Sequence, residues 1–227
     1  AGHQAGAISG QDGIRLLMPP KIGLPILIVA VCFFGCVAQD VLTGGPLTIA
    51  DLRLAEWFHA HSSPLVTRAM LAITHVHDPI PATIGVVLFS VYLALKRNWY
   101  WLACLGVTMP FGMLLNVTLA NGFQRTRPLF DDPLLVLTTY SFPSGHVTGS
   151  TLFYGVLAAM LISRIHVWSW RAAFVMSAIM MVSLVALTRL YLGVHFLSDV
   201  LAGVAEGVAW LTLCLVGMYS FRAIRRS

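Results

Sequence analysis

Long apolar runs dominate this sequence and restrict what it can fold into. A membrane-spanning helix needs about twenty mostly apolar residues. Six runs approach or exceed that length, at roughly 22–42, 80–96, 99–119, 147–164, 170–188 and 198–220. The second run is short, and Pro79 and Pro81 mark its start. The chain is therefore predicted to be an all-α, polytopic bundle of six transmembrane helices.

The composition supports a membrane environment. The 227 residues are 58% hydrophobic and only 10% charged, whereas a soluble domain is about one quarter charged. We expect a single membrane-embedded domain over 21–227, preceded by a flexible tail over 1–20. The opening "AGHQAGAISGQDG" lacks the apolar core of a signal peptide. Residues 43–79 mix charged and apolar side chains, which predicts short amphipathic helices at the interface.

The basic residues predict an orientation. Cytoplasmic loops carry an excess of Lys and Arg, and nine of the fourteen fall on one side of a six-span arrangement, which predicts cytoplasmic termini. Those nine are Arg15, Lys21, Lys96, Arg97, Arg164, Arg171, Arg222, Arg225 and Arg226. The basic residues behind the net charge of +5 are thus explained by their side of the membrane, and they do not indicate nucleic acid as a partner. The other five are Arg53, Arg68, Arg125, Arg127 and Arg189, which are predicted to lie on the outer side.

Two outer connections hold most of the informative polar residues, namely "NGFQRTRPLFDDPLLVLTTYSFPSGH" and "TRLYLGVHFLSD". In the second, His195 and Asp199 lie four residues apart, one turn along a helix. A carboxylate there can accept the Nδ1–H of the imidazole and leave Nε2 free as a nucleophile or base. Gly193 allows a turn between Arg189 and His195.

The other residues of these connections form a candidate anion site. Arg127 and Arg189 can each bind two phosphate oxygens with one guanidinium group. Ser144 and Gly145 precede a span whose first N–H groups attract an anion, and His146 is placed to exchange a proton. Together these residues predict phosphoryl transfer through a covalent phosphohistidine.

The segments "RTRP", "PSGH" and "TRLYLGVHFLSD" resemble the three signature motifs of the type 2 phosphatidic acid phosphatase superfamily, which includes six-span lipid phosphatases and the vanadium haloperoxidases. The resemblance covers residues 120 to 199. It implies that His195 attacks phosphorus, that Asp199 orients it, and that His146 protonates the leaving alcohol and then activates water. Arg127, Arg189, Ser144 and Gly145 would hold the phosphoryl oxygens, with no cofactor and no metal.

The sequence departs from the family pattern at two positions. Ala120 stands where the first motif normally has a lysine, seven residues before Arg127. Arg125 is a candidate to supply the lost charge as a further phosphate-binding residue. Thr188 replaces the usual serine of the third motif.

The predicted function is hydrolysis of a lipid phosphate or diphosphate at the outer, periplasmic face of a bacterial inner membrane. Undecaprenyl diphosphate, phosphatidic acid and phosphatidylglycerol phosphate are the candidate substrates. A phosphotransferase with the same residues, and a weakly active lipid-binding or transport protein favoured by Ala120, remain open.

The segment "HVHD" at 75–78 imitates a metal site only weakly. For Glu206, an interhelical hydrogen bond and a functional role are both open. The sequence leaves the oligomeric state undetermined.

Overall fold

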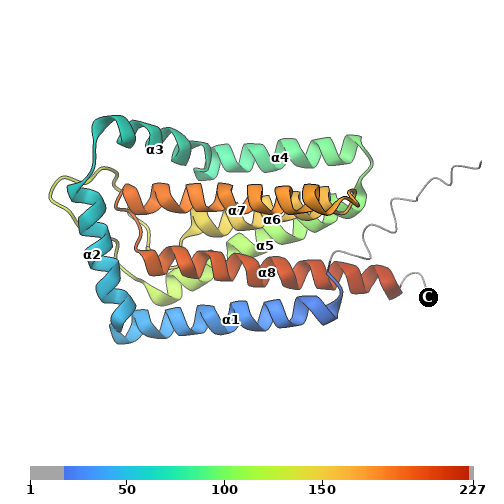
Figure 1. The fold of residues 1–227 in the computed structure, drawn as a ribbon, viewed down its shortest axis with the longest axis horizontal. Helices are drawn as coiled ribbons and strands as arrows, with labels where there is room; N and C mark the ends of the chain where they lie inside the picture. The colour runs from blue at the N-terminus through green and yellow to red at the C-terminus, as the bar shows by residue number, and fades with distance from the viewer. Residues whose placement is uncertain (1–17, 225–227) are drawn as a thin grey trace, which may run out of the picture.

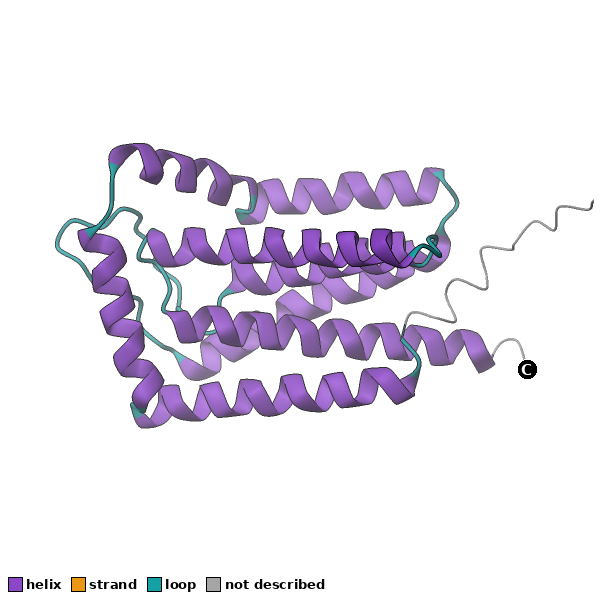
Figure 2. Cartoon of the chain, in the orientation of Figure 1, coloured by secondary structure: helices purple, strands orange, loops and turns teal. Residues whose placement is uncertain are grey.

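The computed structural model describes residues 18–224, so nearly all of the predicted N-terminal tail lies outside the described residues. The described chain consists of helices joined by turns and loops (Figure 2). In chain order these helices are α1 (Pro20–Thr43), α2 (Pro46–Ala60), α3 (Pro64–Val76), α4 (Pro79–Leu95), α5 (Trp99–Phe123), α6 (Gly145–Ile162), α7 (Trp168–Tyr191) and α8 (Leu197–Ile224).

Proline sets the start of the first four helices. Each has Pro in its first turn, at Pro20, Pro46, Pro64 and Pro79, where the missing N–H has no intrahelical partner to lose and the fixed φ suits a helix. These prolines divide the N-terminal part of the chain into separate rods rather than one continuous helix.

Five helices are individually long and apolar enough to cross a membrane: α1, α5, α6, α7 and α8. They match five of the six predicted spans to within a few residues. Helix α4 has 17 residues and passes the same test only when joined to α3, from which it bends by 47°. The structure therefore has the predicted all-helical membrane architecture, with five or six spans.

Helices α2 and α3 are arranged differently from each other. Figure 1 shows α2 crossing one end of the bundle, as expected of an interfacial helix, whereas α3 runs along the bundle and meets α4 at a bend of 47°. The prediction of interfacial helices over 43–79 thus describes α2, while α3 continues into α4 across this bend. The break between them lies at His77 and Asp78, where Pro79 begins a new helix.

Helices α6 and α8 form the centre of the bundle. Half of the apolar stretch of each is buried, against 22% in α1 and α7. A Cβ atom on Gly203 of α8 would lie 2.8 Å from the Ser144 carbonyl oxygen, and one on Gly207 would lie 2.7 Å from Thr151 Cβ. Two small residues four apart therefore let α8 lie directly against α6. This close packing fixes the start of α6 beside the start of α8.

The starts of α6 and α8 lie at the end of the bundle that α2 crosses (Figure 1). The α4–α5 and α6–α7 connections, which carry Lys96, Arg97 and Arg164, lie at the opposite end. The two polar connections singled out in the sequence thus meet at one end of the molecule.

Candidate active site

His195 lies in the turn between α7 and α8. Gly193 makes this turn with a φ of +66°, a conformation that favours glycine. The His195 ring is 3% exposed, and its Nδ1 lies 2.8 Å from the Ser141 carbonyl oxygen. Because a carbonyl only accepts, Nδ1 must carry the proton and Nε2 the lone pair. Nε2 lies 3.1 Å from Arg127 Nη1, which can donate to it.

Asp199 lies beside this ring in the first turn of α8. Its Oδ2 is 3.5 Å from His195 Nδ1 and accepts a hydrogen bond from the Phe196 N–H at 2.8 Å. The Asp199 carbonyl accepts the Ser144 N–H at 3.0 Å, which ties α8 to α6. The carboxylate was expected to be the direct acceptor of the imidazole proton. In the structure the Ser141 carbonyl oxygen lies closer to His195 Nδ1 than the Asp199 carboxylate does, so Ser141 accepts the hydrogen bond and Asp199 provides a negative charge beside the ring.

The ionisation of His195 suits a nucleophile. Burial lowers its pKa to about 4, with Asp199 opposing the shift and Arg127 and Arg189 adding to it. The imidazole is therefore neutral at physiological pH, and its Nε2 lone pair faces Arg127 Nη1.

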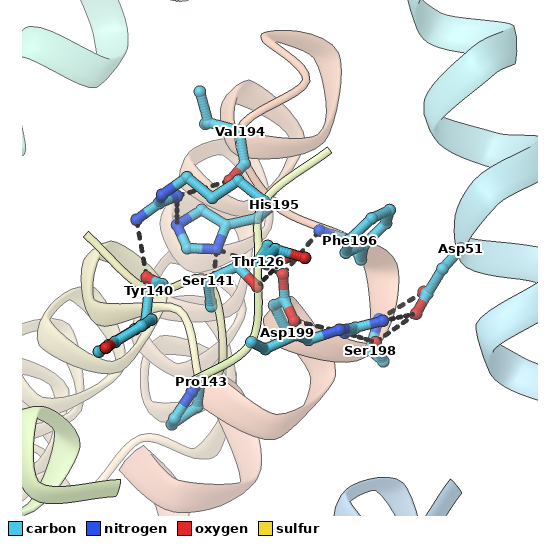
Figure 3. A network of polar contacts seen from close by, with 12 residues as sticks. Asp51, Thr126, Tyr140, Ser141, Pro143, Val194, His195, Phe196, Ser198 and Asp199 are labelled. Carbon is cyan, nitrogen blue, oxygen red and sulfur yellow. Dashed lines mark hydrogen bonds and ion pairs between the residues drawn. The ribbon is translucent and has the colours of Figure 1, made fainter. Parts of the chain in front are cut away.

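Arg127 is anchored in the loop before α6. Its Nε donates to the Thr139 carbonyl at 2.7 Å, and its Nη2 donates to the Thr139 hydroxyl and the Tyr140 carbonyl, each at 2.9 Å. Its Nη1 donates to the Val194 carbonyl next to His195. Figure 3 shows Tyr140, Ser141 and Val194 around the ring of His195. These carbonyl groups fix the guanidinium group against Nε2.

Arg189 is fully buried at the end of α7, and most of its donors are unused. Its Nη1 donates to the Thr74 hydroxyl at 2.6 Å, while Nε and Nη2 have no acceptor among the described residues. The buried Ser144 hydroxyl also lacks a partner there. Buried polar atoms normally find partners, so these unused donors fit an anionic ligand such as a phosphoryl group.

His146 lies in the first turn of α6 and is held by a residue outside the predicted site. Its Nε2 is 2.9 Å from Asp78 Oδ1, and the other carboxylate oxygen is 2.8 Å from His75 Nδ1. Partial burial raises the pKa of Asp78, but the bonds from His75 and His146 outweigh it and leave this pKa below its ordinary value. Asp78 is thus ionised beside His146 and can stabilise a charged ring. The "HVHD" segment was visible in the sequence, but nothing there linked it to residue 146.

The two arginines bring both histidines into one site. Arg127 and Arg189 lie within electrostatic reach of both His146 and His195. Gly145 begins α6 between these groups, but its Cα faces α5: an added Cβ would lie 3.0 Å from Asn116 Oδ1. Close helix packing is therefore one constraint on Gly145, and the approach of a ligand to its backbone stays a prediction.

Arg125 points away from this cluster. Its guanidinium group donates to Asp199 Oδ1 at 2.6 Å and to Asp51 Oδ2 at 2.9 Å. A side chain that pairs with two carboxylates in this way is not available as the predicted substitute phosphate ligand. Ala120 is half-buried in the last turn of α5 and adds no charge, so Arg189, whose Nε and Nη2 have no acceptor among the described residues, is the guanidinium group best placed to bind an anion.

Comparisons with known proteins agree on a family. A family model described as the PAP2 superfamily matches residues 101–223. Phosphatidylglycerophosphatase B of Bacillus subtilis is 33% identical over 154 residues, covering 64% of this chain and 71% of that protein. Lipid A 1-phosphatase of Rhizobium etli is 33% identical over 136 residues, but this covers only 53% of its length and 56% of this chain.

A solved structure resembles the chain over nearly its whole length. The crystal structure of a transmembrane PAP2-type phosphatidylglycerolphosphate phosphatase from Bacillus subtilis superposes with a TM-score of 0.74 at 26% identity. The match covers 88% of this chain and 97% of the other. The matched family segment, residues 101–223, includes the two polar connections that form the candidate site.

Proposed function

This chain belongs to the PAP2 superfamily, as an integral membrane lipid phosphatase, and we propose that it hydrolyses its substrate through a phosphohistidine at His195. The observation that carries the proposal is the pair of buried Arg189 nitrogens without acceptors among the described residues, on a guanidinium group within electrostatic reach of the neutral His195 imidazole. A phosphoryl group held by these donors would present its phosphorus to His195 Nε2.

In the first step, the Nε2 lone pair of His195 forms a bond to phosphorus. The bond between phosphorus and the lipid oxygen breaks, and His146, protonated on both ring nitrogens before this step, gives one proton to that oxygen. Since His146 Nε2 is engaged by Asp78 at 2.9 Å, Nδ1 is the ring nitrogen left for this transfer. The His195 ring gains positive charge as it is phosphorylated, and Asp199 lies 3.5 Å from its Nδ1.

In the second step, His146 takes a proton from a water molecule, whose oxygen attacks the phosphohistidine. The bond between phosphorus and Nε2 breaks, inorganic phosphate leaves, and His195 returns to its neutral form. Arg127, Arg189, the Ser144 hydroxyl and the first N–H groups of α6 stabilise the charge that develops on the phosphoryl oxygens. These residues supply the positive charge for both steps, so the proposal assigns no role to a metal.

The substrate is proposed to be a lipid phosphate whose tail remains in the bilayer. The site lies at one end of the apolar bundle, where a headgroup meets water. Phosphatidylglycerol phosphate, phosphatidic acid and undecaprenyl diphosphate are the candidates, and the names of the relatives favour phosphate groups on lipids. We infer that the site faces the periplasm of a bacterial inner membrane, because the other end carries the basic residues typical of the cytoplasmic side.

A substrate panel tests this function. The purified protein in mixed micelles should release inorganic phosphate from at least one of the three candidate lipids, and release should continue in EDTA. Failure with all three lipids would contradict the proposed substrate class. Activity lost in EDTA and restored by a divalent cation would contradict the mechanism.

Asp78 provides a separate prediction about the general acid. Asp78→Asn removes the charge that stabilises protonated His146, so we expect kcat for a lipid phosphate to fall about 100-fold, within the range for general acid catalysis. A nitrophenyl phosphate, whose leaving group needs no proton, should lose much less. The measurement is phosphate release from both substrates, with the exposed Asp132→Asn as control. Equal losses on the two substrates would contradict the assigned role.

A further inference from the structure

Asp51 of α2 caps the start of α8, although the two residues that meet are 147 positions apart in the sequence. Its Oδ1 accepts the Ser198 N–H at 2.9 Å, and its Oδ2 accepts the Ser198 hydroxyl. The Asp51 side chain is fully buried. A carboxylate at this position satisfies an otherwise unpaired N–H group and lies at the positive end of the helix dipole. The interfacial helix is therefore joined to the helix that follows His195.

Arg125 links this cap to Asp199. One guanidinium group donates to Asp51 at 2.9 Å, and to the Ser198 hydroxyl and Asp199 each at 2.6 Å. It also lies over the Phe196 ring, 4.4 Å from the centroid. Figure 3 shows Asp51, Ser198 and Asp199 joined in this network beneath His195. Three segments of the chain therefore meet at the residue beside the nucleophile.

The charges of this network bear on the proposed chemistry. Two fully buried carboxylates share one guanidinium group that is 12% exposed, so the cluster carries one net negative charge. Two buried carboxylates this close can both stay ionised only because the Arg125 guanidinium group pairs with each of them. The excess negative charge lies on the Asp199 side of the imidazole, where positive charge develops when Nε2 is phosphorylated.

We propose that Asp51 and Arg125 are positioning residues that hold Asp199 and the first turn of α8 and maintain a negative charge beside His195. This inference rests on the proposed function for its kinetic consequence. It also explains why Arg125 lies apart from the phosphate donors: its partner is the support of the nucleophile. Through Asp51, the helix that crosses the end of the bundle becomes part of that support.

Asp51→Asn tests the proposal with little change of shape, because the amide oxygen can still accept the Ser198 N–H, while the NH2 group replaces the oxygen that accepts from Arg125 and from the Ser198 hydroxyl. We expect kcat to fall about tenfold, as for residues coupled within one network, with KM for the lipid unchanged because no phosphate donor is altered. Glu56→Gln removes a carboxylate from the exposed side of the same helix and should leave both constants unchanged. Asp51→Asn and Arg125→Gln together should lose less than the sum of their separate effects.

A second measurement does not depend on turnover. The ring nitrogens of His195 can be followed by NMR in protein labelled with 15N-histidine, and assigned with His195→Gln. The charged groups around this ring are Asp199, Arg127 and Arg189, with Asp51 and Arg125 acting through Asp199. Removing the Asp51 charge makes a protonated ring less stable. At the pH where half of the wild-type rings are protonated, the Asp51→Asn ring should therefore stay mostly neutral, and the Glu56→Gln ring should behave as wild type.

The outcomes separate the two claims. An unchanged His195 titration in Asp51→Asn would overturn the positioning role, whatever the activity. If the wild-type protein releases no phosphate from any lipid, yet Asp51→Asn still shifts the His195 titration relative to wild type, the proposed function is contradicted and the positioning role is supported. An equal fall of kcat in Glu56→Gln would also overturn the proposal.

Discussion

His195→Gln is expected to lower phosphate release from a lipid phosphate by at least about 10⁴-fold, as for other enzymes that lose their nucleophile. Glutamine has no nitrogen lone pair that can attack phosphorus. The variant should still bind the lipid, because Arg127, Arg189 and Ser144 are unchanged. The measurement is the inorganic phosphate released in mixed micelles. The enzyme is used in large excess over any contaminating phosphatase, so that a contaminant cannot account for residual release.

His166→Gln is the matched control for this variant. It makes the same substitution at an exposed position between α6 and α7, at the end of the bundle away from the site (Figure 1), and should leave the rate unchanged. Phosphate release by His195→Gln within tenfold of the wild type would rule out a covalent role for His195.

Arg189→Met is expected to lower kcat/KM about 1000-fold, which is typical for the loss of one strong donor to a charged transition state. The same change should leave the ligand-free protein at least as stable. In the wild type, the buried guanidinium group has two nitrogens without acceptors among the described residues, and replacing such a buried charge by an apolar side chain is often neutral or stabilising.

Measuring the melting temperature and the kinetics of each Arg189 variant on the same preparation shows whether activity is lost through phosphate binding or through lower stability. Arg189→Lys should fall between wild type and Arg189→Met, because it keeps a charge and loses the two-pronged geometry. An Arg189→Met protein that is fully active, or one whose inactivity follows directly from a lower melting temperature, would contradict the role of Arg189 in holding phosphate.

Much of the fold could be predicted from the sequence because each span depends mainly on its own composition. Apolar runs of about twenty residues and four helix-starting prolines place most boundaries without reference to the rest of the chain. The joining of α3 and α4 into one bent pair was not predicted, and neither was the contact of Asp78, at their junction, with His146, because contacts between residues 68 positions apart leave no local pattern.

The candidate site also has a part that could be predicted from the sequence and a part that could not. The sequence could nominate candidate site residues that stand at fixed spacings within three short motifs, namely His146, His195, Arg127, Arg189 and Ser144. The supporting residues have no such spacing, since Asp51 and Ser198 are 147 positions apart. The tautomer of His195 is fixed by the backbone carbonyl of Ser141, and any residue type could supply that carbonyl, so the sequence gives no signal for it. Arg125 was assigned to phosphate because its charge was visible and its two carboxylate partners were not.

The most direct test of this account is to identify the phosphorylated residue during turnover. Protein mixed with a lipid carrying a labelled terminal phosphate should be stopped in alkali after milliseconds to seconds, since phosphohistidine survives base and is lost in acid, and its peptides mapped. The account predicts label on His195 in the wild type and none in His195→Gln. Full-rate phosphate release with no labelled protein, or with the label on another residue, would contradict it.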